Sequence, residues 1–264
     1  MPINRPNVFS PAQSSTPDFF FDVARGAYGD FYQTLNIAGY KEAIGTSEGI
    51  ISFQSGFEPY VSETYKTIVS NSTQDQSTGT GARTVQVTGV DASGDFLQQT
   101  VTLTGAVPVT FPTAYAFVNE VKVLTAGSNY NNVGTLTIEN APGTDSIDIA
   151  PNTGRSQFGA YLVPNGFRLV VMSSDFTVAN ADVDCNVTIT MRKYSGIVSG
   201  APVAHIVYRG VTSLDNAHEQ GSFFQSQFPL LFNPGEMVTY WAKSSAASNS
   251  IAAVQGYGVL MQDS

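Results

Sequence analysis

Hydrophobic and polar residues alternate with a period of two along residues 79–105. In the first half of this stretch Val85 and Val87 fall on one side of an extended chain, with polar residues between them. In the second half Val101 and Leu103 share a side in the same way. A period of two is typical of a β-strand with one buried face. The stretch therefore predicts two half-buried strands.

A short turn separates these two strands. Residues 91–95 read Asp-Ala-Ser-Gly-Asp and supply turn-forming residues. Gly94 can adopt the positive φ that a tight hairpin loop requires. The pattern predicts a β-hairpin.

Similar short apolar stretches recur along the rest of the chain, separated by turns rich in Gly, Pro and Asn. Two turns, around Pro164-Asn165-Gly166 and Pro234-Gly235, place glycine where φ is expected to be positive. No segment keeps a helical period beyond two turns, and a short helix is expected only near Asp18. The predicted strands are residues 33–38, 50–54, 65–69, 117–124, 135–139, 158–163, 167–172, 187–191, 203–208, 227–232, 237–242 and 252–261. The polar segment 71–81 is expected to be an exposed loop.

These elements predict an all-β fold in three parts. Residues 1–31 form an extended, Pro-rich N-terminal arm with the short helix. Residues 32–153 form an antiparallel sandwich or barrel that contains the 79–138 hairpin module. Residues 154–264 form a jelly-roll-like β-sandwich.

Composition narrows the range of partners. Only 12% of the 264 residues are charged and the formal net charge is −9, with basic residues scattered along the chain. This pattern argues against nucleic acid as a partner. No apolar run approaches the length of a membrane span, so we expect no membrane insertion. The single cysteine, Cys185, cannot form an intrachain disulfide and is expected to be a buried small residue.

Catalytic and cofactor motifs are missing from the sequence. There is no phosphate-binding glycine loop and no nucleophile elbow. His205 and His218 lie in different segments, and His205 alternates with valines as a residue of a strand would. Asp182 and Asp184 could face one calcium ion, but a solvated turn is the favoured interpretation. We therefore expect no enzymatic activity, no cofactor and no metal.

Two groups of residues are candidates for binding. The arm offers apolar residues that could contact a neighbouring subunit, namely Val8, Phe9, Phe19, Phe20 and Phe21. Tyr240 and Trp241 are adjacent aromatic residues that could form a platform for a sugar ring, although packing in the core is the more common role of such residues.

The hairpin region resembles a module of β-rich virion structural proteins of tailed, notably aquatic, bacteriophages. The similarity lies in GTGARTVQVTGVDASG from Gly79, QTVTLTG from Gln99, FVNEVKVLTAGS from Phe117 and NVGTLTI from Asn132. DFFFDVARG from Asp18 and QFGAYLVPNG from Gln157 also resemble segments of these proteins. The resemblance spans most of residues 18–172. The matching residues are mainly turn glycines and alternating strand residues, so they do not distinguish head from tail proteins.

This resemblance implies a structural protein of the virion, made in the host cytoplasm, that forms homo-oligomers and binds other virion proteins. The leading hypothesis is a decoration, cement or head-fibre protein on the capsid surface. The alternative is a tail or adsorption protein that recognises a host-surface carbohydrate. A β-sandwich hydrolase is the third and least favoured class.

Overall fold

The computed structural model describes residues 23, 31–53, 65–139, 146–179, 184–196, 202–214, 220–246 and 250–263. Their regular structure is almost entirely antiparallel β-sheet, which confirms the predicted all-β class. The first nine strands are β1 (Tyr32–Lys41), β2 (Gly49–Ile50), β3 (Tyr65–Ser70), β4 (Ala82–Val90), β5 (Phe96–Thr102), β6 (Val109–Tyr115), β7 (Phe117–Ala126), β8 (Leu136–Glu139) and β9 (Ser146–Ile149). The others are β10 (Ala160–Leu162), β11 (Phe167–Ala179), β12 (Cys185–Ser195), β13 (Val203–Leu214), β14 (Gln220–Phe232), β15 (Met237–Ser244) and β16 (Ile251–Gln262).

Strands from both ends of the described chain build a jelly roll. One sheet has the order β1-β16-β11-β14, and the other has the order β10-β15-β12-β13. With β1 and β10–β16 counted in chain order, these sheets read 1-8-3-6 and 2-7-4-5. This is the arrangement of two Greek keys that defines a jelly roll. Its closing step is the pairing of β1 with β16, which aligns Tyr32 with Met261 and Lys41 with Ala252.

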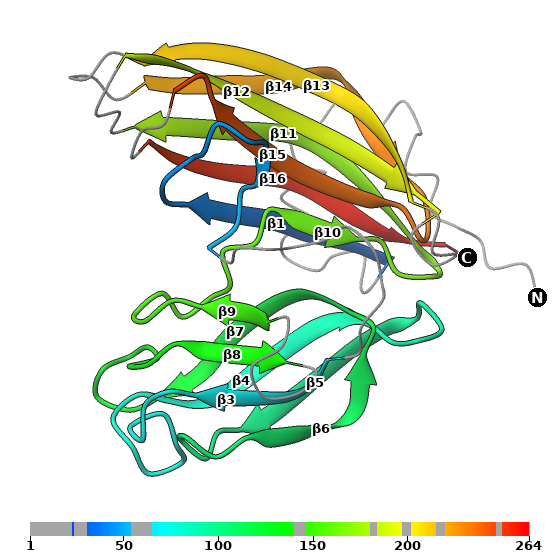
Figure 1. Cartoon of the computed structure of the whole chain (residues 1–264). Coiled ribbons are helices and arrows are strands. Elements are labelled where there is room, and N and C mark those ends of the chain that lie inside the picture. The colour runs from blue at the N-terminus through cyan, green and yellow to red at the C-terminus, as the bar shows by residue number, and fades with distance from the viewer. Residues whose placement is uncertain are drawn as a thin grey trace, which may run out of the picture.

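A second module, β3–β9, is inserted into one edge strand of the jelly roll (Figure 1). Both β2 and β10 pair with β15, and the residue of β15 between them is Tyr240. The N–H of Ile51 donates to the carbonyl of Tyr240 at 2.8 Å, and the N–H of Tyr240 donates to the carbonyl of Gly159 at 2.8 Å. The chain therefore leaves the sheet at Ile51 and returns to the same position at Gly159. A Cβ on Gly39 of β1 would overlap both of these backbones, which explains the glycine there.

The insertion module is itself a small sandwich. Its sheets have the orders β6-β3-β8-β9 and β5-β4-β7. The predicted hairpin is β4–β5, where Val85 pairs with Val101, and both valines are buried. Gly94, in its turn, has φ +85°, as predicted.

Three hydrophobic clusters stabilise the chain. One fills the jelly roll and includes Phe176, Phe232 and Tyr240. A second fills the insertion module, around Val85, Val87 and Tyr115. The third joins the modules, because its residues come from both of them: Val90, Ala116 and Phe117 from the insertion, and Ile50, Phe158, Ala160, Leu162, Tyr194 and Met237 from the jelly roll.

The structure differs from the expected organisation in one main respect. The predicted module 32–153 grouped β1 and β2 with the hairpin, whereas both strands pair with strands of the predicted module 154–264. The reason is that the strand that pairs with β1 is β16, more than 200 positions later in the chain. The predicted arm, 1–31, lies almost wholly outside the described residues. Within it, Val23 is helical and buried.

Segment 71–81 is a loop with most of its residues exposed, as predicted, but Asp75 within it is fully buried. Its Oδ1 accepts hydrogen bonds from the N–H groups of Ala82 and Val133, each at 2.8 Å. Its Oδ2 accepts from the hydroxyl of Ser70 at 2.7 Å and from the N–H of Gly134 at 2.9 Å. One carboxylate thus ties two loops to the end of β3.

Candidate assembly surface

The insertion module covers the jelly-roll edges formed by β1 and β10. The side chain of Asn119, on β7, makes with β10 the pair of backbone hydrogen bonds that a neighbouring strand would make. Its Nδ2 donates to the carbonyl of Leu162 at 2.9 Å, and its Oδ1 accepts from the N–H of Leu162 at 2.8 Å. Beside it the rings of Phe117 and Phe158 have centroids 5.8 Å apart.

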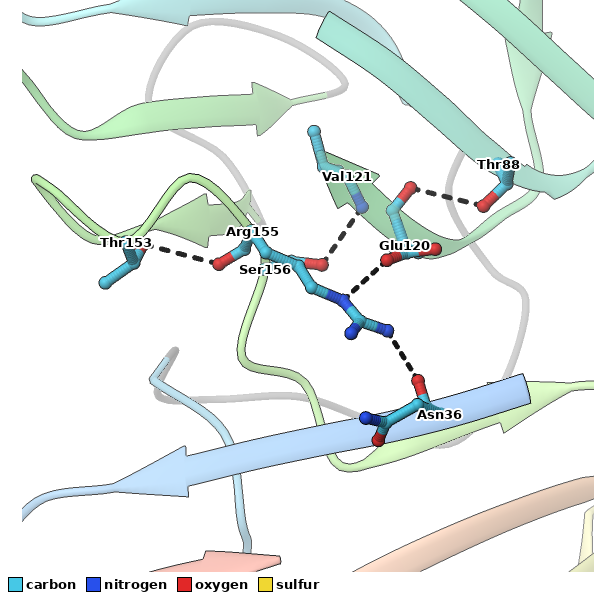
Figure 2. A network of polar contacts seen from close by, with 7 residues as sticks. All are labelled: Asn36, Thr88, Glu120, Val121, Thr153, Arg155 and Ser156. Carbon is cyan, nitrogen blue, oxygen red and sulfur yellow. Dashed lines mark hydrogen bonds and ion pairs between the residues drawn. The ribbon is translucent and has the colours of Figure 1, made fainter. Parts of the chain in front are cut away.

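Arg155 covers the edge of β1 in a comparable way (Figure 2). Its guanidinium donates to the carbonyl of Asn36 at 2.6 Å and pairs with the carboxylate of Glu120 at 2.5 Å. The next residue, Ser156, accepts a hydrogen bond from the N–H of Val121 at 3.0 Å. These contacts link β1 of the jelly roll to β7 of the insertion module.

The hairpin tip provides a third attachment. The N–H of Asn165 donates to the carbonyl of Gly94, and its side chain donates to the carbonyl of Ser93, each at 2.8 Å. The rings of Phe96 and Phe167 pack with centroids 5.7 Å apart. The two modules are therefore joined at several points.

The described residues of the junction line a small cavity. It has a volume of about 10 Å³ and is lined in part by Asn36, Glu120, Arg155 and Tyr161. That is room for about one water molecule. Burial, and secondarily the charge of Glu120, raises the pKa of Tyr161, so its hydroxyl stays neutral. This cavity is too small for an organic ligand.

We expect Asn119→Ala to weaken the junction. The change leaves the N–H and carbonyl of Leu162 buried without partners, at about 1–3 kcal/mol for each unsatisfied group. Calorimetry should show lower stability and separate transitions of the two modules. Gln99→Ala is the matched control, because Gln99 makes the same pair of bonds to Thr113 at an exposed site inside the insertion module. Equal effects of the two substitutions would contradict a coupling role for Asn119.

On the opposite side of the jelly roll, no further described strand continues either sheet. Strands β13 and β14 end the two strand orders there, and among the described strands β13 pairs with β12 alone. Figure 1 shows both strands on the side turned away from the insertion module. Along β13 three apolar side chains are exposed: Val203 by 53%, Ile206 by 52% and Val211 by 65%. A long apolar edge strand is a template for pairing with another chain.

The charge of β13 is opposite in sign to the net charge of the chain. The described strand β13 carries His205 and Arg209, both exposed, and no acidic residue, whereas the chain as a whole has a net charge of −9. The strand thus offers apolar contacts, backbone groups and positive charge together. We call β13 with its exposed side chains the β13 edge.

The structure places the predicted binding residues as follows. Tyr240 is fully buried, and its hydroxyl shares a hydrogen bond of 2.9 Å with that of Ser174, so its proposed role in a sugar platform was wrong. Trp241 is half-buried, its Nε1 donates to Thr239, and the guanidinium of Arg192 lies 4.8 Å from its ring centre. The arm residues Val8, Phe9, Phe19, Phe20 and Phe21 lie outside the described residues.

The remaining expectations concern the cysteine, the histidines, metal binding and membrane insertion. Cys185 is buried, as expected, and His205 lies exposed on the edge strand β13. Within the described ranges, no group of three or more His, Cys, Asp or Glu side chains could hold a metal ion. No helix in the part of the chain that the structure describes is long and apolar enough to cross a membrane.

The β13 edge could not be found from the sequence, because only the strand order of a sheet shows which strand is the edge strand.

No protein-family model matches the chain, and no curated protein matches it. Among solved structures, the T=1 particles derived from infectious bursal virus align at 9% identity with a TM-score of 0.27, over 88% of this chain and 70% of that one. The Gt strain of infectious bursal disease virus aligns at 11% identity and a TM-score of 0.26, over 94% and 78%. The VP2 subviral particle of the same virus aligns at 10% identity and a TM-score of 0.27, over 94% and 78%. TM-scores of this size do not establish a common fold, and the architecture above follows from the strand pairing of this chain.

Proposed function

We propose that this chain is a non-enzymatic structural protein of a tailed-phage virion, acting as a decoration, cement or head-fibre protein on the capsid surface. The sequence resemblance of residues 18–172 to virion proteins supports this role. The jelly roll is compatible with it, since the fold occurs in viral capsids as well as in lectins and cupins. A fold alone does not assign a function. The observation that carries the proposal is therefore the β13 edge.

The distribution of covered and open edges favours assembly. The insertion module satisfies the edges of β1 and β10 through Arg155 and Asn119. The β13 edge exposes three large apolar residues instead. An added strand would pair with its main chain and bury these side chains, which is the usual mode of β-augmentation. A stable contact needs about 800 Å² on each partner, so further surface beside β13 takes part.

The proposed occupant is a second copy of this chain, bound head to tail. Antiparallel pairing of β13 with itself about a two-fold axis near Arg209 would bring the two Arg209 side chains together, and facing like charges are unfavourable. An acidic surface of a neighbouring copy complements the strand better, because the chain has 21 Asp and Glu against 12 Lys and Arg. Heterologous contacts of this kind close into rings when the rotation permits. The N-terminal arm is a predicted second contact in the same assembly.

A charge placed on the β13 edge tests this role. We expect Val211→Lys to convert the wild-type oligomer into monomer in light scattering and native mass spectrometry. The melting temperature should change little, because the side chain at position 211 is exposed. The matched control is Leu124→Lys, which changes an exposed apolar residue on β7 and should leave the oligomer intact. A wild-type protein that stays monomeric at high concentration, or a Val211→Lys oligomer of unchanged size, would overturn the proposal.

A further inference from the structure

The insertion module carries a highly exposed aromatic side chain, far in sequence from the β13 edge. Its exposed fraction is the largest among the large apolar residues that the structure describes. Tyr130, in the loop between β7 and β8, is 86% exposed. Its φ is +60°, a left-handed conformation that is uncommon for a residue other than glycine. Strained backbone of this kind persists only where the surrounding structure fixes it, and it is concentrated at functional sites.

Hydrogen bonds fix the Tyr130 loop to the turn that precedes β4. The N–H of Gly127 donates to the carbonyl of Gly81 at 2.8 Å, and the N–H of Asn129 donates to the carbonyl of Thr80 at 2.9 Å. The N–H of Tyr130 closes the turn on the carbonyl of Gly127 at 3.1 Å. A Cβ on Gly127 would overlap the backbone of the facing turn, so the two loops are in direct contact.

A third turn, residues 150–154, is fixed to the same loop. The side chain of Asn131 donates to the carbonyl of Asn152 at 3.1 Å, and the N–H of Asn152 donates to the carbonyl of Asn132 at 2.9 Å. Asn152 also has a positive φ, +62°. The buried carboxylate of Asp75 accepts hydrogen bonds from the N–H groups of Val133 and Gly134, which fixes the C-terminal end of the Tyr130 loop. The aromatic ring therefore stands on a rigid base.

The chemistry around the ring is polar and neutral. The exposed or half-exposed side chains of the three turns are amides and hydroxyls, including Gln74, Thr80, Asn129, Asn131, Asn152 and Thr153. The only acidic or basic residue in segments 71–80, 126–134 and 150–154 is Asp75, which is buried. We call these three turns with Tyr130 the Tyr130 platform.

We propose that the Tyr130 platform binds a neutral oligosaccharide, with a pyranose ring stacked on Tyr130 and its hydroxyls bonded to the surrounding amides. A pyranose with equatorial hydroxyls presents C–H groups on its faces, which pack against an aromatic ring, and hydroxyls at its rim. The rigid base lowers the entropic cost of binding. The cation that contacts these turns, Arg83, is engaged by a hydrogen bond from its Nε to the carbonyl of Gly79 at 3.2 Å. A protein partner would need several apolar anchors over a larger area, and this surface offers one.

This inference goes beyond the assembly role and does not depend on it. The platform lies on the insertion module, whereas the β13 edge lies on the jelly roll, so each can be altered without touching the other. A failure of oligomerisation would leave the sugar site standing. A failure of sugar binding would likewise leave the assembly role standing.

The test is an NMR titration of the full chain with two probes, cellotetraose and chitotetraose. We expect saturable shifts of amides in segments 79–81, 127–132 and 152–154 with at least one probe. Tyr130→Ala should weaken binding at least about tenfold, the loss of one stacked aromatic anchor. Tyr130→Phe should retain most of the affinity, because it keeps the ring.

Matched variants keep this test decisive. Tyr257→Ala removes another exposed tyrosine, from β16 of the jelly roll, and should leave sugar binding unchanged. Removal of the Tyr130 side chain is expected to cost little stability, since most of it is in solvent. The proposal is overturned if neither probe gives saturable shifts at millimolar concentration. It is also overturned if Tyr130→Ala binds as well as wild type.

Discussion

Replacing Asp75 with alanine is expected to lower the free energy of unfolding by about 3–5 kcal/mol, because three backbone N–H groups and one hydroxyl lose their common acceptor. All four donors bond to one buried carboxylate, and they belong to β3, β4 and the loop before β8. The loss should therefore loosen the whole distal end of the insertion module.

Thermal unfolding and hydrogen exchange measure this effect. Asp75→Ala should melt at a lower temperature, and the amides of Ala82, Val133 and Gly134 should exchange faster. Asp91→Ala is the matched control, since Asp91 also accepts two backbone N–H bonds but does so in the exposed hairpin turn. An Asp75→Ala protein as stable as Asp91→Ala would show that the buried carboxylate does not organise the loops.

The Val101→Asp substitution is the second change with a large expected effect. Val101 is buried in the core of the insertion module, opposite Val85 on the neighbouring strand. A carboxylate placed there has no partner, and burying an unpaired charge costs several kcal/mol. Against a total stability of about 5–15 kcal/mol, this is enough to unfold the module at moderate temperature.

Circular dichroism melting can compare this variant with Thr100→Asp. Thr100 is the preceding residue of β5, and its side chain is exposed on the other face of the strand. We expect Thr100→Asp to remain within about 0.5 kcal/mol of wild type. Similar melting temperatures for the two aspartate variants would mean that the two faces of β5 do not differ as described.

Local features of the fold could be predicted from the sequence because they depend on neighbouring residues. The alternation in β4 and β5 identified the buried valines, and Gly94, Gly166 and Gly235 have the positive φ expected of them. Strand β6 escaped prediction because Pro112 interrupts its pattern, a residue that edge strands tolerate. The four-residue strand β9 also escaped prediction.

Long-range pairing could not be predicted in the same way. Nothing within residues 32–53 indicates that β1 pairs with β16, or that the sheet continues from Ile51 to Gly159 across the insertion. These contacts join residues about 100 or more positions apart. The sequence pattern marks a strand but does not identify its neighbour.

The candidate binding residues show the same limit. Tyr240 and Trp241 are adjacent on β15 and therefore point to opposite faces. Every residue from Met237 to Tyr240 is buried, since both faces of this strand are covered there. Aromatic character alone could not reveal that Tyr240 belongs to the core. Asp75 was missed for the related reason that a polar loop gives no sign of a buried carboxylate.

An electron cryomicroscopy map of the assembled oligomer would test the central claim most directly. The account predicts that a segment of a neighbouring copy lies along β13, on the side away from β12, and covers Val203, Ile206 and Val211. A map in which the copies touch through other surfaces, with β13 facing solvent, would contradict it.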